Sequence, residues 1–196
     1  MCDTTGGERP PALRPSPSFN QRERRLMAKI AAILTDWFED VEYTKPVDDF
    51  REAGHTVVTV GLAAHAVVTG KKEGTKVTVD VSFDDVAPDE FDALLIPGGY
   101  SPDKLRAHDK PVAFVKAFME AEKPVFSICH APQILITAKT LKGRHVTGYK
   151  SIVQDIINAG ARYEDKEVIV DGNLVTSRQP SDLPAFIRES LKLLAG

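Results

Sequence analysis

The stretch KPVFSICHAPQILI, Lys123–Ile136, decides the fold prediction, because an apolar run changes into a helix-like segment at a cysteine. Val125–Ile128 is almost wholly apolar and follows a proline, which is typical of a short buried strand. Pro132 suits the first turn of a helix, which we expect over Ala131–Ala138. Cys129 therefore lies at a strand-to-helix junction, the arrangement of a nucleophile elbow.

The thiol of Cys129 has two interpretations. Unpaired amide N–H groups and the positive end of the helix dipole gather at a helix N-terminus, and such a site lowers the pKa of a cysteine below its free value of about 8.5. His130 follows directly and is a candidate partner for the thiolate. The alternative is a buried, inert cysteine with a histidine cap. We favour the reactive thiol because the junction, the histidine and the helix start coincide.

Composition narrows the class of protein. The chain has 196 residues, of which 42% are hydrophobic, enough for one domain with its own core. A net charge of −3 and a pI near 6.0 offer no basic surface for nucleic acid, and no apolar run of about 18 residues predicts a membrane span. Cys2 and Cys129 lie far apart, so we expect no stabilising disulfide and a cytoplasmic location. The sequence contains neither HExxH nor CxxC, so we expect no metal and no cofactor.

The N-terminal stretch differs from the rest of the chain. Residues 1–26 are rich in Pro, Gly, Ser and Arg and lack the apolar segment of a signal peptide. We therefore expect a disordered tail over 1–26 and one domain over 27–196. The sequence leaves open whether translation starts at Met1 or Met27.

Strand-like and helix-like segments alternate from Lys29 onward. We predict strands at 29–35, 55–62, 92–97, 125–128, 145–147, 167–170 and 174–176, helices at 40–53, 110–122, 131–138, 151–159 and 181–194, and a hairpin or edge pair around 71–74. This alternation predicts an α/β fold, a layered sandwich in which helices cover both faces of a mostly parallel sheet.

The active crevice of such a sheet lies beyond the carboxyl ends of its strands. The loops that follow four predicted strands should converge there: 36–42, 98–106, 129–130 and 177–184. Glu39, in the first loop, is the carboxylate that we expect beside Cys129. The alternative for Glu39 is a solvated acid at a helix N-terminus, where the dipole favours negative charge.

The glycine pair at 98–99 also has two interpretations. Glycines commonly serve a tight turn. Alternatively, the N–H of Gly99 points into the crevice and forms an oxyanion hole with the N–H of His130, which would matter if Cys129 attacks a carbonyl. Asp103 is a candidate to orient His130, although an Asp after a proline is more commonly a helix-start residue.

Four segments carry a family resemblance: FEDVE, LLIPGGYSPDKLR, KPVFSICHAPQIL and INAGARYEDKEVIVDGNLVTSRQPSDLPAF. Together they resemble the PfpI branch of the DJ-1/PfpI superfamily over about residues 28–194. The resemblance implies a flavodoxin-like, class I glutamine amidotransferase-like three-layer sandwich. It also implies that Cys129 is the nucleophile, His130 its partner, Glu39 the acid hydrogen-bonded to the sulfur and Gly99 the oxyanion-hole glycine.

The chain departs from the family pattern at two positions. The family places a Glu shortly after its PGG motif, contributed to the site across a subunit interface, whereas Asp103 stands there in this chain. Ala131 replaces the glycine that many members have after the histidine. The resemblance further implies self-association, as a dimer or a trimer of dimers, in which Asp103 of one subunit approaches His130 of another.

The activity that the resemblance implies starts from a reactive thiol. We expect a cysteine-dependent general stress protein that acts on reactive carbonyls such as methylglyoxal or on glycation adducts, as a glyoxalase or deglycase. An intracellular peptidase acting on peptide substrates is the alternative within the enzymes. A redox sensor, in which Cys129 cycles to sulfenic or sulfinic acid beside Glu39, is the alternative from another class.

Overall fold

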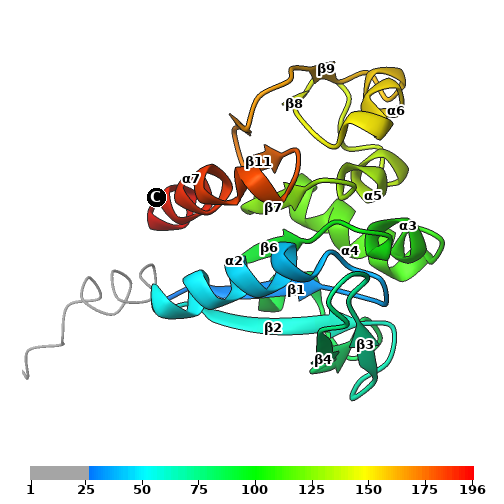
Figure 1. The fold of residues 1–196 in the computed structure, drawn as a ribbon, viewed down its shortest axis with the longest axis vertical. Helices are drawn as coiled ribbons and strands as arrows, with labels where there is room; N and C mark the ends of the chain where they lie inside the picture. Colours follow the sequence, from blue (N-terminus) through cyan, green and yellow to red (C-terminus); the bar gives the residue numbers. More distant parts are fainter. Residues whose placement is uncertain (1–26) are drawn as a thin grey trace, which may run out of the picture.

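A seven-stranded sheet forms the centre of the molecule, with strand order β10–β11–β7–β6–β1–β2–β5 (Figure 1). The computed structural model describes residues 27–196, so the predicted tail over 1–26 lies outside the described residues. Neighbouring strands are parallel except for the antiparallel pair β10–β11. The strands are β1 Lys29–Ile33, β2 Thr56–Gly61, β5 Val81–Ser82, β6 Ala93–Ile96, β7 Val125–Ile128, β10 Val168–Asp171 and β11 Leu174–Ser177.

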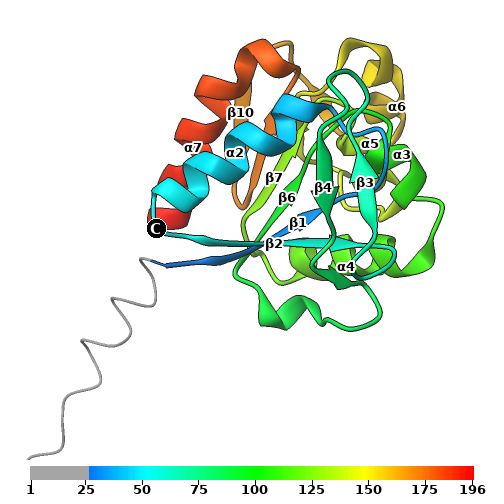
Figure 2. The same ribbon diagram turned by 60° about the horizontal axis from the view of Figure 1, so that its bottom comes forward.

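Helices cover both faces of this sheet. Helices α2 and α7 lie side by side on one face, and α4 and α5 pack on the other (Figure 2). The helices are α2 Asp40–Glu52, α3 Ser101–Leu105, α4 Asp109–Glu120, α5 Pro132–Thr137, α6 Val153–Asn158 and α7 Leu183–Ala195, with 3-10 turns at Pro88–Glu90, Lys150–Ile152 and Pro180–Asp182. Within 27–196, no helix is both long enough and apolar enough to cross a membrane.

Strand β1 shows why the central strands are continuously apolar. Ile30 and Ala32 belong to the core beneath α2 and α7, whereas Ala31 and Ile33 belong to the core beneath α4 and α5. Successive side chains of a strand point to opposite faces, so a strand covered on both sides needs apolar residues at every position. The predicted α/β sandwich with a mostly parallel sheet is confirmed.

Several small elements differ from the sequence expectation. In the predicted hairpin region, β3 Val67–Thr69 and β4 Lys76–Thr78 pair as a hairpin, but β5 joins the main sheet as a parallel edge strand. Strand β8, His145–Val146, pairs outside the main sheet with β9, Arg162–Tyr163, which was not predicted. A strand of two residues is too short to show an alternation of apolar and polar residues, so β9 could not be predicted from the sequence.

Candidate active site

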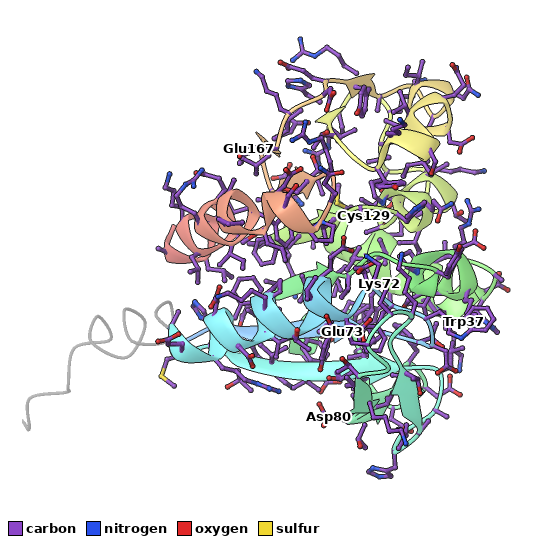
Figure 3. The ribbon with its side chains drawn as sticks, in the orientation of Figure 1. Trp37, Lys72, Glu73, Asp80, Cys129 and Glu167 are labelled. Atoms are coloured by element: carbon purple, nitrogen blue, oxygen red, sulfur yellow. The ribbon has the colours of Figure 1, made fainter. Side chains whose placement is uncertain are left out.

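Cys129 forms a tight turn between β7 and α5. Its φ is 63°, in the left-handed region that residues with a Cβ rarely adopt. Its N–H donates a hydrogen bond to the carbonyl of Ser177 at 3.0 Å, and its own carbonyl accepts one from the N–H of Tyr149 at 2.9 Å. The side chain is only 4% exposed and lines a cavity near the carboxyl ends of the strands (Figure 3). The predicted nucleophile elbow is confirmed.

Close backbone approaches explain the two glycines after β6. A Cβ at Gly98 would collide with the carboxyl group of Glu42 and lie 2.6 Å from the Cβ of Cys129. Gly99 has a φ of 77°, and a Cβ there would lie 2.5 Å from the carbonyl oxygen of Trp37. Both positions therefore exclude a side chain, and their packing places the loop after β6 directly against the elbow.

Two amide groups converge on the sulfur of Cys129. The N–H groups of Gly99 and His130 lie near the sulfur, and both lower the pKa of the thiol, which favours its thiolate form. These are the two amides that the sequence predicted as an oxyanion hole. Their position allows them to bind negative charge on an atom next to the sulfur, but the catalytic role stays a prediction.

The carboxyl group beside the sulfur belongs to Glu42 and not to Glu39. Glu42 is fully buried, and its Oε2 accepts a hydrogen bond from the N–H of Gly98 at 2.9 Å. Its carboxyl group lies beside the Cys129 thiol and interacts with it, while Oε1 makes no hydrogen bond to any residue in the described part of the chain. The predicted contact between Glu39 and the sulfur is wrong by one helical turn.

Burial controls the protonation of Glu42. Burial and the charge of Glu39 raise the pKa of the Glu42 carboxyl group to about 8, against the opposing effects of the nearby Cys129 thiol, of the Gly98 N–H and of Lys71. Glu42 therefore carries a proton at neutral pH. The helical spacing in the sequence could have indicated that Glu42 is buried. It lies four residues before Pro46 and eight before Phe50, on the buried side of α2.

The thiol of Cys129 is also controlled by burial. Burial raises its pKa above the ordinary value, and negative charge on Glu42 raises it further, while the amides of Gly99 and His130 lower it by less. The low pKa expected from a helix N-terminus is therefore corrected. The sequence shows where α5 begins but not the depth of the sulfur. A protonated Glu42 carries no charge that could oppose the thiolate, so burial remains the main cause of the raised pKa of Cys129.

His130 lines the same cavity and stacks on Tyr149, with ring centroids 4.7 Å apart. Burial and the positive charge of Lys71 lower its pKa, against the opposite effect of Asp103, so the imidazole is neutral at pH 7.

The carboxyl group of Asp103 does not form a hydrogen bond with the His130 ring of the same chain. It accepts hydrogen bonds from Nε and Nη2 of Arg106 at 2.9 and 2.6 Å. The predicted contact between Asp103 and a neighbouring subunit's histidine stays a prediction.

Glu39 lies in the cavity as the partner of two lysines. Its Oε2 is 2.8 Å from Nζ of Lys71, and its Oε1 is 3.0 Å from Nζ of Lys72. The cavity has a volume of about 660 Å³ and is lined by Glu39, Lys71, Lys72, Gly99, Tyr100, Cys129, His130, Tyr149, Ser151, Gln179, Pro180 and Ser181. The two lysines come from the β3–β4 hairpin and were not predicted, because no local pattern relates them to the elbow.

Among residues 27–196, no cluster of three or more His, Cys, Asp or Glu is arranged to hold a metal ion.

The fold and the site define a class: α/β sandwich proteins with a cysteine on a strained elbow, backbone amides at the sulfur and a buried acid beside it. The chain belongs to the DJ-1/PfpI family, whose model matches residues 28–193. The predicted family is thus confirmed.

Three relatives show the range of names within the family. The chain is 59% identical to "Putative cysteine protease YraA" of Bacillus subtilis over 86% of this chain and 99% of that protein. It is 54% identical to "Protein/nucleic acid deglycase 2" of Escherichia coli, with the same two coverages. It is 58% identical to "General stress protein 18" of Bacillus subtilis over 85% of this chain and 97% of the relative.

Solved structures agree with the fold. A two-domain protein from Anabaena variabilis, with DJ-1/ThiJ/PfpI-like and ferritin-like domains, superposes with a TM-score of 0.83 at 39% identity. The match covers 86% of this chain but only 49% of that longer one. Drosophila melanogaster DJ-1beta superposes with a TM-score of 0.78 at 27% identity, over 86% and 91% of the two chains.

Proposed function

We propose that this protein is a cysteine-dependent stress enzyme that acts on reactive carbonyls such as methylglyoxal, or on the glycation adducts they form. One observation carries the proposal: the thiol of Cys129 sits on a strained elbow between two amide donors and a neutral acid. This set of groups suits addition of a thiol to a carbonyl, because the amides can bind the developing oxyanion and Glu42 can supply a proton. The names of deglycase relatives support the same substrate class.

A 2-oxoaldehyde would react in three steps. The sulfur of Cys129 bonds to the aldehyde carbon, and the aldehyde oxygen takes up a proton to give a hemithioacetal. A base then removes the hydrogen on that carbon, and a proton is returned to the neighbouring carbon. The hydroxyl proton of the hemithioacetal passes to the oxygen of that neighbouring carbon, which gives a thioester of a 2-hydroxy acid. Water cleaves the thioester to the acid and restores the thiol. The net change adds one water molecule and needs no external oxidant or reductant.

His130 is better suited than Glu39 to be the base. A neutral imidazole at pH 7 can accept a proton, and the lowered pKa of His130 keeps it in that form. Both oxygens of Glu39 are already in ion pairs with lysine ammonium groups. We therefore assign the proton transfer to His130 and the neutral-acid role to Glu42.

The proposal is tested by following the conversion of methylglyoxal to lactate. Cys129→Ala should lower the rate by about a thousandfold or more, because the covalent step is lost. Cys2→Ala is the matched control, since it removes the other cysteine of the chain and should leave the rate unchanged. Normal conversion by Cys129→Ala would contradict the proposal.

Peptidase activity is a second candidate, supported by the name of YraA. A peptide bond is less reactive than an aldehyde, so the reaction depends more strongly on a firmly oriented base. In this chain Asp103 is bound to Arg106 instead of His130. This arrangement favours small-carbonyl chemistry over proteolysis.

Redox sensing is a candidate from another class, and the neutral carboxyl group of Glu42 favours it. A protonated acid next to the sulfur can donate a hydrogen bond to a sulfenate or sulfinate oxygen. Titration with peroxide, followed by the intact mass of the protein, separates this role from turnover. A sensor would gain oxygen atoms at Cys129 at low peroxide without converting methylglyoxal.

A further inference from the structure

Two lysines on one wall of the cavity have no part in the steps above. Lys71 and Lys72 come from the tip of the β3–β4 hairpin, and both face Glu39 in the cavity that contains Cys129. Figure 3 labels Lys72 and Cys129. Lysine has three donors on its ammonium group, so the contact with Glu39 leaves two on each lysine for another anion. The side chain of Lys72 is 64% exposed, which leaves it free to turn toward a bound molecule.

The charges of the cavity favour an anion. Glu42, His130 and the thiol of Cys129 are neutral at pH 7. The two ammonium groups therefore face the single negative charge of Glu39, which leaves a net charge of +1 beside the thiol. The whole chain has a net charge of −3, so this positive charge is local to the site.

The hairpin tip is held in place and is not a loose loop. The buried carboxylate of Asp40 accepts hydrogen bonds from the N–H groups of Lys72, Glu73 and Thr75 at 3.0, 3.3 and 2.9 Å. The N–H of Lys71 donates to the carbonyl of Phe38 at 2.9 Å, which ties the tip to the loop after β1. These contacts fix the backbone that carries both ammonium groups, so the positive wall is built into the fold.

From this we infer that Lys71 and Lys72 recognise a carboxylate on the substrate, so that the preferred substrates are carbonyl compounds that also carry a carboxylate. The Glu39 carboxylate, with one ammonium on each oxygen, shows that the lysine pair accepts this group. A substrate carboxylate binds the unused donors of the same lysines while its carbonyl carbon faces Cys129. The inference rests on the proposed function for the identity of the reacting group, but the recognition of the anion is separate from turnover.

Alkylation of Cys129 tests the recognition directly. Iodoacetate and iodoacetamide transfer nearly the same group to a thiolate, but only iodoacetate carries a carboxylate. The ratio of their rate constants therefore reports attraction of an anion to the cavity. Lys72→Met should lower the ratio of iodoacetate to iodoacetamide by about threefold to tenfold at low salt, because one positive charge near the site is lost.

Glu39→Gln should move the ratio in the opposite direction, upward by a similar factor, because both ammonium groups are then available to the reagent. Damage to the fold would not raise one ratio and lower the other. Lys116→Met is the matched control, since Lys116 also pairs with a glutamate, Glu120, on the exposed surface of α4. All differences should shrink as the salt rises from about 0.01 M to about 1 M.

Turnover gives the second readout. For dioxovalerate, a 2-oxoaldehyde with a carboxylate at its far end, Lys72→Met should raise KM by a larger factor than for methylglyoxal, which carries no carboxylate. Ratios in Lys72→Met and Glu39→Gln equal to that of Lys116→Met would overturn the inference, whether or not the protein turns over carbonyls. Shifted ratios without any turnover would overturn the proposed function and leave the anion recognition standing.

Discussion

At the scale of single residues, the protonation of Glu42 has a consequence for stability. A buried acid whose pKa is raised to about 8 keeps its proton in the folded state, whereas the unfolded chain releases it near the ordinary glutamate pKa of 4.5. Between these two values the unfolded state binds fewer protons, so the free energy of unfolding falls as the pH rises. Glu42 therefore costs stability in this window, a cost consistent with a role in the site.

Glu42→Gln should remove this pH dependence. We expect the free energy of unfolding of the variant to exceed that of the unchanged protein by a few kcal/mol at about pH 8, with the difference shrinking toward pH 4.5. Urea unfolding at several pH values measures it. A difference in stability between the two proteins that is the same at pH 4.5 and at about pH 8 would show that Glu42 is ionised in the folded state. The pH profile of Cys129 alkylation should also lose its inflection near pH 8.

At the scale of elements, the β3–β4 hairpin depends on Asp40 at the start of α2. Burial alone would raise the pKa of this carboxyl group, but hydrogen bonds from Lys72, Thr75 and Glu73 outweigh it and lower the pKa from 3.8 to about 2. A depressed carboxyl pKa stabilises the folded state above pH 3.8, and this contribution is lost as the pH falls through about 2. One side chain thus couples the helix to the hairpin that carries the lysines.

Asp40→Asn should lower the free energy of unfolding by on the order of 2 kcal/mol at pH 7, since an amide accepts fewer of these hydrogen bonds than a carboxylate. The loss should shrink as the pH falls below 3.8. Asp48→Asn is the control, because Asp48 is exposed on the same helix and the change of charge is identical. Equal stabilities for the two variants would contradict the coupling of α2 to the hairpin.

At the scale of the whole molecule, we expect self-association to decide the role of Asp103. Within one chain this exposed carboxylate is bound by Arg106, and only its charge reaches His130. We expect an oligomer in which Asp103 meets the histidine of a neighbouring subunit. Because Asp is one methylene shorter than Glu, that contact requires a closer interface or a bridging water.

Two measurements test this assembly. Sedimentation should give a dimer or a larger species, and a monomer would contradict the prediction. Asp103→Glu should raise peptidase activity by a few fold, because the longer side chain orients His130 more firmly. Asp109→Glu, the same change at an exposed position at the start of α4, is the control. Unchanged peptidase activity in an intact Asp103→Glu oligomer would exclude Asp103 as the orienting acid.

The sequence by itself determined the parts of the fold that follow from local patterns. Apolar runs with helical segments between them identified the parallel strands, and a short strand, a cysteine and a proline in succession identified the elbow at Cys129. These features depend on residues a few positions apart, where propensity and periodicity act directly. The amides of Gly99 and His130 were placed together for the same reason, since each belongs to the second residue after a predicted strand.

Only the tertiary structure decided which acid reaches the sulfur and which charges face it. Glu39 and Glu42 are one turn apart, and the choice between them depends on how α2 is rotated against the sheet, which is set by the packing of Tyr43, Val47 and Phe50. The raised pKa values of Glu42 and Cys129 arise from burial, which is a property of the whole core. Lys71 and Lys72 enter the cavity through a hairpin docked on α2 by long-range hydrogen bonds, and no local period in a sequence records such a contact.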